Sequence, residues 1–333
     1  MKSQGKPKIL IILGILCLFI VLVVITLDKI NLSKKVIPSK LRLGYIKAMA
    51  ELPVYISLEK NYFRDQDLDV ELVPLGYKEE VDALIRGDID IIPATSLTLP
   101  FGIEAQSPNK VKIFHLGGIN DNDNEVVEGI LVFENSPIIK IEDLKGKKVG
   151  VPEGSVDYFV MKTVLTKLDL EPEKNKIQIL QMNKNVLPQA FISKQVDAVY
   201  LTQPQLAVVK RQTSARYLIV NPRAKHVLNP FWSGGGVVRT NYFENKERKQ
   251  LFAKYLKAID TAIDYMRNNP QESKGFLSKY ANLEEDLTKE MGNYFKIKTN
   301  EKIDFDSLQK VADIYKDVGI LNNKIDVSNL VLR

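Results

Sequence analysis

The stretch ALIRGDIDIIPATS (residues 83–96) contains the end of a helix, a sharp turn, a strand that carries aspartate, and a run of small hydroxyl residues. The predicted helix ends at Gly87, because glycine readily adopts the left-handed conformation that ends helices. Ile89, Ile91 and Ile92 supply the β-branched content typical of a short strand. We therefore predict a helix, a glycine turn and a strand that ends near residue 92.

Two further strands and two helices precede this stretch. LRLGYI (residues 41–46) and the alternating positions around Val70 and Leu72 have the spacing of strands. One helix is predicted to begin near Pro53, because proline is favoured in the first helical turn, and a second to cover residues 78–86. The order strand, helix, strand, helix, strand is typical of a parallel sheet with crossover helices.

A second stretch, AFISKQVDAVY (residues 190–200), has the same pattern. The seven-residue spacing from Ala83 to Asp90 recurs from Ala190 to Asp197, and the upstream strands recur at offsets of 106 and 107 residues. We interpret this as one α/β unit that occurs twice, with both aspartates at turns or strand edges. Chance similarity between two such units is the alternative. A true repeat predicts two similar α/β lobes.

Composition limits the classes of function. The 333 residues are 45% hydrophobic and 26% charged, which is an ordinary globular composition and allows one large domain or two lobes. The 47 basic and 41 acidic residues are interspersed, so the net charge of +6 favours a solvated surface and no nucleic-acid partner. The single cysteine, Cys17, excludes a disulfide framework and a CxxC metal site.

The N-terminus predicts a membrane anchor. Residues 9–27 contain no charge, and nineteen residues at ~1.5 Å each make a helix of about 28 Å, close to the thickness of a bilayer core. Lysines in residues 1–8 predict that this end is cytoplasmic and that the remainder is extracytoplasmic, after a linker over residues 28–39. A cleaved signal peptide and a lipoprotein are the alternatives.

The repeat indicates where a ligand would bind. In open α/β sheets the site lies beyond the carboxyl ends of the strands, which here are residues 47–51, 93–96, 153–155 and 202–204. Hydroxyl groups and helix N-termini can hold an anion without arginine or lysine. Plain N-capping by the serine and threonine side chains is the alternative.

Several motifs in order resemble the NMT1/THI5-like family of substrate-binding proteins, which serves nitrate, taurine and alkanesulfonate ABC importers. The resemblance covers about residues 40–290. It rests on LPVYISLEKNYFRDQDLDVELVPL (52–75), ALIRGDIDI (83–91), IEDLKGKKVGVPEGS (141–155), AFISKQVDAVYLTQP (190–204) and KYLKAIDTAIDYMRNNPQES (254–273).

The resemblance implies a type II periplasmic-binding-protein fold, in which two lobes joined by two crossing strands close on a ligand. EGILVF (128–133) and GGGVVR (234–239) fit the crossing strands. Lobe 1 would then comprise residues 40–131 and 237–333, and lobe 2 residues 132–236. The implied partners are a small-molecule ligand, an ABC permease and its ATPase. A sulfonate, taurine or nitrate type of anion is implied as the ligand.

Two departures from the family pattern bear on that ligand. Lys194 replaces a common glycine, and Gln203 replaces a glutamate, which removes a negative charge and makes amine-bearing ligands less secure. Trp232 is predicted either to stack on a ligand at the hinge or to pack in the core. The predicted ligand-binding residues are Met49, Glu51, Thr95, Ser96, Gly154, Ser155, Gln203 and Trp232.

The sequence offers few residues from which a catalytic site could be built. His115 and His226 are the only histidines, Cys17 lies in the apolar segment, and no nucleotide-phosphate loop is present. His115 is predicted to be a core residue. We predict no cofactor, no metal and no catalytic residue. A sensory or accessory binding domain, or an enzyme similar to the pyrimidine synthases on the same fold, remains the alternative.

Overall fold

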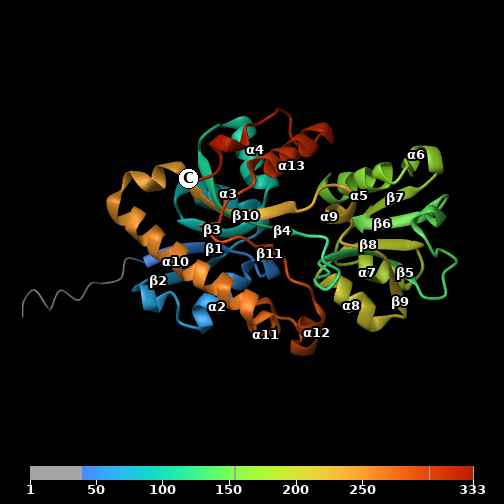
Figure 1. Ribbon diagram of the computed structural model, residues 1–333, viewed down its shortest axis with the longest axis horizontal. Helices are drawn as coiled ribbons and strands as arrows, with labels where there is room; N and C mark the ends of the chain where they lie inside the picture. Colours follow the sequence, from blue (N-terminus) through green and yellow to red (C-terminus); the bar gives the residue numbers. More distant parts are fainter. Residues whose placement is uncertain (1–39, 154, 300, 333) are drawn as a thin grey trace, which may run out of the picture. The chain divides into compact units, whose positions relative to one another are not determined.

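Two β-sheets organise the part of the chain that the structure describes (Figure 1). The computed structural model describes residues 40–153, 155–299 and 301–332, and residues 40–333 form one unit. The predicted anchor, its cytoplasmic flank and the linker lie outside the described residues. Within the described residues, no helix is both long enough and apolar enough to cross a bilayer.

The first sheet has six strands in the order β11-β4-β10-β3-β1-β2. β1, β2 and β3 are mutually parallel neighbours, whereas β10 runs antiparallel to both β3 and β4. Its strands are β1 (Lys40–Tyr45), β2 (Asp69–Pro74), β3 (Ile91–Ser96), β4 (Val111–Ile119), β10 (Phe231–Arg239) and β11 (Phe295–Lys296).

The second sheet has five strands in the order β7-β6-β8-β5-β9. It repeats the first arrangement, because β6 pairs in parallel with β7 and β8, and an antiparallel strand, β5, follows on the far side of β8. Its strands are β5 (Glu128–Phe133), β6 (Lys148–Pro152), β7 (Gln178–Met182), β8 (Ala198–Thr202) and β9 (Ala215–Val220).

Helices connect and cover these strands. The helices are α2 (Leu52–Glu59), α3 (Tyr77–Arg86), α4 (Thr98–Gln106), α5 (Ser155–Lys167), α6 (Pro172–Asn175), α7 (Leu187–Ile192), α8 (Gln205–Gln212), α9 (Pro222–His226), α10 (Lys246–Asn268), α11 (Pro270–Ala281), α12 (Glu285–Glu290) and α13 (Phe305–Asp317). The short 3-10 helices include η1 (Met49–Glu51), η2 (Arg64–Gln66) and η4 (Thr240–Glu244).

The predicted repeat is confirmed at the level of hydrogen bonds. In the first sheet the Asp90 carboxylate accepts from the Arg42 N–H at 2.9 Å, and the Asp90 N–H donates to the Arg42 carbonyl at 2.8 Å. In the second sheet Asp197 makes the same two bonds with Lys148, at 2.8 and 2.9 Å. Each aspartate therefore fastens the start of one parallel strand to its neighbour, which explains why an acid recurs at this position.

The end of the third strand differs from the prediction. Gly87 adopts the expected left-handed conformation (φ 85°), but β3 begins at Ile91 and continues through Pro93 to Ser96. The hydroxyl run therefore belongs to the strand rather than to the loop after it. Pairing with the antiparallel β10 extends the strand, and sequence periodicity does not reveal that pairing.

Alternating side chains divide the first sheet between two apolar cores. Ile92 and Val237 point into a core that α13 completes, whereas Ile91 and Val238 point into a core that α10 completes. Figure 1 shows α4 and α13 on one side of this sheet and α10 and α2 on the other. Both faces of the sheet are therefore buried. A ligand can approach the sheet at the ends of its strands.

The chain passes between the two sheets twice. β5 pairs only with strands of the second sheet, and β10 only with strands of the first. EGILVF and GGGVVR are therefore not the crossings themselves; the crossings are residues 120–127 and 221–230. The predicted lobe boundaries stay a prediction.

Asn221 ties the two crossing segments together. Its side-chain oxygen accepts from the Val127 N–H at 3.0 Å, and its side-chain nitrogen donates to the carbonyls of Asn122 and Glu125, both at 3.1 Å. Asn221 is fully buried and left-handed (φ 46°), a conformation that asparagine tolerates better than most residues.

Candidate functional site

Four strands of the first sheet, β1, β2, β3 and β4, end at one edge. β3 is parallel to β1, and β4 runs in the same direction because the antiparallel β10 lies between β3 and β4. The carboxyl ends of such strands form the usual ligand edge of an α/β sheet. Met49 and Glu51 follow β1, and Thr95 and Ser96 end β3, so four of the predicted residues lie at this edge.

Glu51 is a buried acid at this edge. It ends η1, has no exposed surface, and neither carboxylate oxygen has a hydrogen-bond partner among the described residues. Burial raises the pKa of Glu51 well above its ordinary value. The Lys296 ammonium partly opposes that shift and Glu80 adds to it. Backbone N–H groups of Ala94 and Ile46 also lower the pKa, although neither meets hydrogen-bond geometry.

Lys296 brings a cation to the same edge. It lies on the two-residue strand β11, opposite Gly117 of β4, and is 4% exposed. No hydrogen bond or salt bridge joins its ammonium to another residue in the described part of the chain. Burial lowers the pKa of Lys296 to about 8, while Glu51 opposes the shift. A Cβ at Gly117 would lie 2.9 Å from Nζ, so glycine makes room for the lysine.

Glu80 and Thr95 add a hydrogen-bonded pair of side chains to this edge. The Thr95 hydroxyl donates to Glu80 Oε2 at 2.9 Å, and Oε1 has no partner in the described residues. Glu80 is fully buried on α3, and burial raises its pKa to about 7 although the Thr95 hydrogen bond lowers it. Burial therefore favours the protonated form of this carboxyl group more than in a solvent-exposed glutamate.

His115 on β4 completes this group. Its Nδ1 has no partner among the described residues, and burial, followed by the charge of Lys296, lowers its pKa to about 3. The imidazole is therefore neutral at physiological pH. The prediction that His115 is a core residue is confirmed. We use the name edge cluster for Glu51, Glu80, Thr95, His115 and Lys296.

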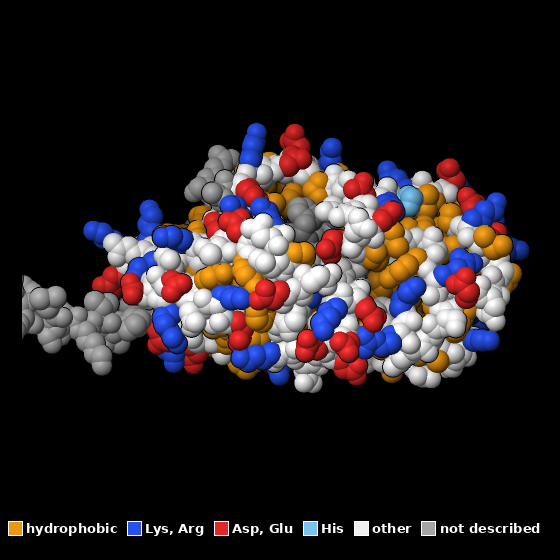
Figure 2. All heavy atoms as spheres, turned by 60° about the horizontal axis from the view of Figure 1, so that its bottom comes forward, with side chains coloured by type: hydrophobic (Ala, Val, Ile, Leu, Met, Phe, Trp, Pro, Cys, Tyr) orange, Lys and Arg blue, Asp and Glu red, His pale blue; other side chains and the backbone are white. Residues whose placement is uncertain are grey.

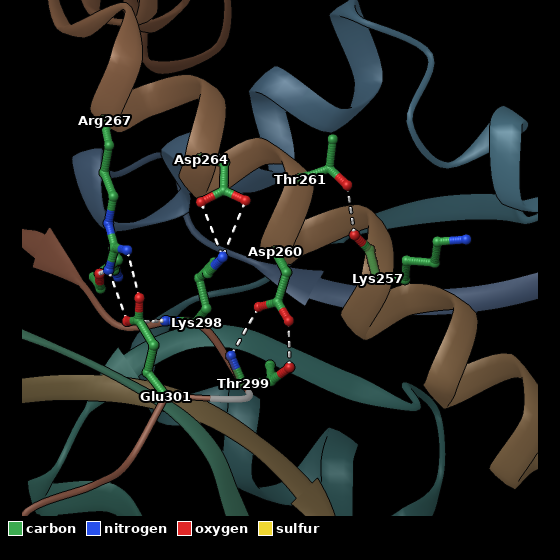
Figure 3. Close-up of polar contacts among 9 residues, drawn as sticks. Lys257, Asp260, Thr261, Asp264, Arg267, Lys298, Thr299 and Glu301 are labelled. Carbon is green, nitrogen blue, oxygen red and sulfur yellow. Dashed lines mark hydrogen bonds and ion pairs between the residues drawn. The ribbon is translucent and has the colours of Figure 1, made fainter.

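A polar clamp on α10 fixes the strand that carries Lys296 (Figure 3). The Arg267 guanidinium donates to both carboxylate oxygens of Glu301, at 2.5 and 2.8 Å, and to the Lys296 carbonyl at 2.5 Å. The Arg267 fork lowers the pKa of Glu301 to about 2. Arginine suits this role because its planar fork matches a carboxylate.

Two more contacts hold the segment after Lys296 against the same helix. The Lys298 ammonium lies 3.1 Å from the Asp264 carboxylate, and Thr299 donates to Asp260 through its N–H at 2.8 Å and its hydroxyl at 2.5 Å (Figure 3). The backbone that presents Lys296 is therefore anchored at several points.

The other predicted residues at these edges have local or packing roles. Met49 packs with Leu52, Tyr55 and Ala207 in one buried cluster. The Ser96 hydroxyl accepts from the Thr98 N–H at 3.4 Å and from the Thr98 hydroxyl at 3.0 Å, so its contacts are local, although the N-cap of α4 is Leu97 and has no side-chain cap.

Gln203 lies at the end of the second sheet. Its side chain donates to the Val126 carbonyl at 3.0 Å and accepts from the Ala207 N–H at 3.2 Å. Ala207 shares the buried cluster of Met49, so these predicted residues from the two sheets lie close together.

Trp232 packs in the core. It is 3% exposed, and its Nε1–H donates to the Ser307 hydroxyl of α13 at 2.6 Å. This fits the packing alternative, and stacking on a ligand stays a prediction. Gly154 lies outside the described residues, and Ser155 is the first residue of α5.

A second buried charged group lies at the crossings. The Glu128 carboxylate accepts from the Arg223 N–H at 2.9 Å, from the Arg223 guanidinium, and from the Tyr200 hydroxyl at 2.6 Å. The Arg223 guanidinium also lies over the Phe231 ring, 5.4 Å from its centroid. We use the name crossing cluster for Glu128, Tyr200 and Arg223.

Sequence reasoning missed Lys296, Glu80 and the crossing cluster. Lys296 follows Glu51 by 245 positions and occupies a strand of only two residues, which gives no periodic signal. Glu80 is indistinguishable in the sequence from the exposed acids of an amphipathic helix. Only the fold brings these residues to Glu51 and Thr95.

Comparison with solved structures identifies the fold. The periplasmic aliphatic sulphonate-binding protein SsuA from Escherichia coli superposes with a TM-score of 0.71 at 20% identity, covering 89% of this chain and 92% of that chain. The alkanesulfonate-binding protein SsuA from Xanthomonas axonopodis pv. citri, bound to MOPS, gives 0.65 at 19% identity, covering 89% and 99%. The desulfurization enzyme DSZB also shares the fold, with a TM-score of 0.63 at 12% identity, covering 88% and 96%.

Sequence relatives are named as binding proteins. A "Putative aliphatic sulfonates-binding protein" of Bacillus subtilis (strain 168) is 26% identical over 88% of this chain and 85% of the relative. A "Putative binding protein" of Brucella abortus (strain 2308) is 23% identical over 87% and 89%. The family model described as NMT1/THI5 like matches residues 49–273, about two thirds of the sequence. The chain therefore belongs to the NMT1/THI5-like family.

Proposed function

We propose that this protein is the extracytoplasmic substrate-binding component of an ABC importer, and that it captures a small organic anion of the sulfonate class. The observation that carries the proposal is the unpaired, nearly buried ammonium of Lys296 at the carboxyl edge of the first sheet. A buried cation without a partner is costly, so a position that keeps one is a candidate for an anionic ligand.

The edge cluster suits an oxyanion with several oxygens. Lys296 supplies N–H donors and a positive charge. Burial favours the protonated forms of Glu51 and Glu80, and a protonated carboxyl group is an O–H donor. One ligand oxygen can therefore accept from lysine while others accept from carboxyl groups. Sulfonate, nitrate and carboxylate all meet this requirement, and the names of the relatives favour sulfonate.

Binding would require the two halves of the molecule to part and close again. Contacts between them include the packing of Met49 with Ala207 and the salt bridges of Arg211 with Glu284 (3.1 Å) and Glu290 (2.8 Å). Solvent-exposed ion pairs contribute little stability, typically below about 1 kcal/mol each. Ligand contacts made only in the closed form would then shift the equilibrium toward closure.

Calorimetric titration of the purified full chain tests the proposal. Methanesulfonate, nitrate and acetate are the probes, and Lys296→Met is compared with Lys257→Met, which removes an exposed lysine from α10. We expect Lys296→Met to weaken binding by about 30-fold or more, because it removes a desolvated charge contact, whereas Lys257→Met leaves affinity unchanged. If wild-type protein binds none of these anions, the proposed ligand class is wrong.

Affinity should also depend on pH. The pKa of Lys296 is about 8, so its ammonium is largely retained at pH 7 and lost as pH rises above 8. Methanesulfonate affinity should therefore fall between pH 7 and pH 9. A flat profile would contradict a role for Lys296 in binding.

An enzyme remains a testable alternative because DSZB shares the fold. Bound sulfonate should be recovered intact after long incubation if the chain only binds its ligand. Release of sulfite would instead indicate turnover. A sensory role predicts that the cell responds to the ligand without needing an ABC permease.

We also propose that residues 9–27 anchor the chain in the membrane with residues 40–333 on the outer side. The uncharged apolar run and the preceding lysines support this arrangement. Protease treatment of intact cells should digest the large domain. Sequencing of the mature N-terminus separates an anchor from a cleaved signal.

A further inference from the structure

A cavity of about 540 Å³ lies at the opposite edge of the first sheet from the edge cluster. It is bounded by α3, α4, the start of β4, the end of β10 and η4. This volume is within the range of small-molecule sites. Its lining residues are Ile85, Ile103, Gln106, Ser107, Asn109, Lys110, Arg239, Thr240, Asn241 and Glu244.

Arg239 is an arginine without a partner in this cavity. Its Nε is buried and has no hydrogen-bond partner within the described residues, and no salt bridge of its guanidinium is formed there. Asp90, an acid whose charge acts on Arg239, is already bound by Arg42, whose backbone N–H, Nε and Nη2 donate to it at 2.9, 3.2 and 3.1 Å. Burial, followed by the charge of Arg248, lowers the pKa of Arg239.

The surroundings are arranged around this guanidinium. A Cβ at Gly87 would lie 2.8 Å from Arg239 Nη1, so glycine leaves space for the arginine. The Thr240 hydroxyl is buried and has no partner among the residues described. Lys110 adds a second cation to the lining, while Glu244 is its single acid and is exposed to solvent.

The lining also has an apolar wall. Ile85 is 45% exposed, one of three large aliphatic side chains in the described chain with that much exposed surface, and Ile103 faces the same space. We propose that this cavity is a second binding site, for a small organic anion whose oxyanion group contacts Arg239 and Thr240 and whose apolar body packs against Ile85 and Ile103. The Arg239 fork can bind two oxygens of one oxyanion, and the Thr240 hydroxyl can donate to a third.

This site is distinct from the proposed importer site. The two lie at opposite edges of one sheet and share no residue, since β10 ends at Arg239 on one side and pairs with Ser96 near its other end. Variants at one site should therefore leave the other unchanged.

Titration of the full chain with benzoate and phenyl phosphate tests the inference, with benzyl alcohol as the neutral probe. Arg239→Gln removes the charge with little change of volume, Arg239→Lys keeps the charge without the fork, and Arg64→Gln alters an exposed arginine on η2 as the control. We expect Arg239→Gln to weaken both anions at least about tenfold and Arg239→Lys to weaken them less. Arg64→Gln and Lys296→Met should leave both affinities unchanged, and benzyl alcohol should not discriminate among the proteins.

Thermal unfolding without ligand gives a second readout. Because the half-buried Arg239 guanidinium forms no hydrogen bond or salt bridge with another described residue, Arg239→Gln should unfold at the same temperature as wild type or higher by roughly 2 °C. Equal anion affinity in wild type and Arg239→Gln would overturn the inference, as would failure of both anions to bind. An Arg239→Gln protein that unfolds far earlier or fails to fold would show that Arg239 is structural, and would overturn it too.

Discussion

The crossing cluster and the edge cluster are both buried groups of charged residues, but the charges are paired in the first and unpaired in the second. In the crossing cluster the Glu128 carboxylate accepts from Arg223 and from Tyr200. In the edge cluster neither the Glu51 carboxylate nor the Lys296 ammonium forms a hydrogen bond or salt bridge with another described residue. Paired buried charges maintain a structure, whereas unpaired ones are retained where a partner arrives from outside. This difference is the reason for which we propose the edge cluster, and not the crossing cluster, as the binding site.

Removing one member of the crossing cluster should have the largest effect on stability. Arg223→Met leaves the Glu128 carboxylate buried beside Tyr200 without its cation, which typically costs about 3–5 kcal/mol. Urea denaturation measures the change. Adding Glu128→Leu should recover part of the loss, because the second change removes the orphaned charge. A loss below about 1 kcal/mol for Arg223→Met would show that the paired charges of the crossing cluster contribute no more to stability than the unpaired charges of the edge cluster.

Glu80 should make the free energy of unfolding depend on pH. We expect no such dependence from the crossing cluster. Its pKa is raised to about 7 in the folded protein, so its contribution is fully present below pH 4.5 and is lost as pH rises through 7. The full shift corresponds to roughly 3 kcal/mol. Glu80→Gln should flatten the pH dependence measured by urea denaturation between pH 5 and pH 8.5. An unchanged slope would show that Glu80 is not the responsible group.

Two buried lysines allow a matched comparison. Lys296 and Lys274 are each 4% exposed, but the Lys274 ammonium lies 3.8 Å from the Glu125 carboxylate. Lys274→Met should therefore destabilise the protein, while Lys296→Met should leave stability unchanged or raise it by about 1–2 kcal/mol. Equilibrium denaturation at pH 7 gives both values. Equal losses would indicate that Lys296 has a structural partner.

The clamp on α10 should have the smallest effect on stability and a specific effect on binding. Arg267 and Glu301 are 40% and 33% exposed, so Arg267→Met should cost no more than about 1 kcal/mol. Because Arg267 positions the Lys296 backbone, the variant should weaken methanesulfonate binding about threefold or more. The same change in a Lys296→Met background should have no further effect, and an additive effect would argue against a positioning role.

Periodicity and turn chemistry predicted the repeated α/β unit and the glycine turn at Gly87, because both depend on local sequence. The rule for strand ends also placed Glu51 and Thr95 at the carboxyl edge of the first sheet, where the structure has them; their role in binding stays a prediction. It could not reveal their chemistry, since Thr95 donates to Glu80 of α3 and Glu51 faces Lys296 of β11. Those partners come from distant segments, and pairing with β10 carried β3 beyond its predicted end.

Composition correctly indicated the character of the surface but not the unpaired cations. Figure 2 shows basic and acidic side chains interleaved over the face in view, as the near balance of 47 and 41 residues predicts. Arg239 and Lys296 are two members of that larger set. Lys296 is buried and Arg239 is half-buried, and neither side-chain cation has a hydrogen-bond or salt-bridge partner in the described residues.

Asn221 has a consequence for how the molecule can bend. Two separate strands of polypeptide link the two sheets, and in principle each could twist on its own. Through its amide, Asn221 joins the second link to Val127, Asn122 and Glu125 of the first. Because these three hydrogen bonds join the two links at one buried point, a rotation of one link must carry the other with it or break them.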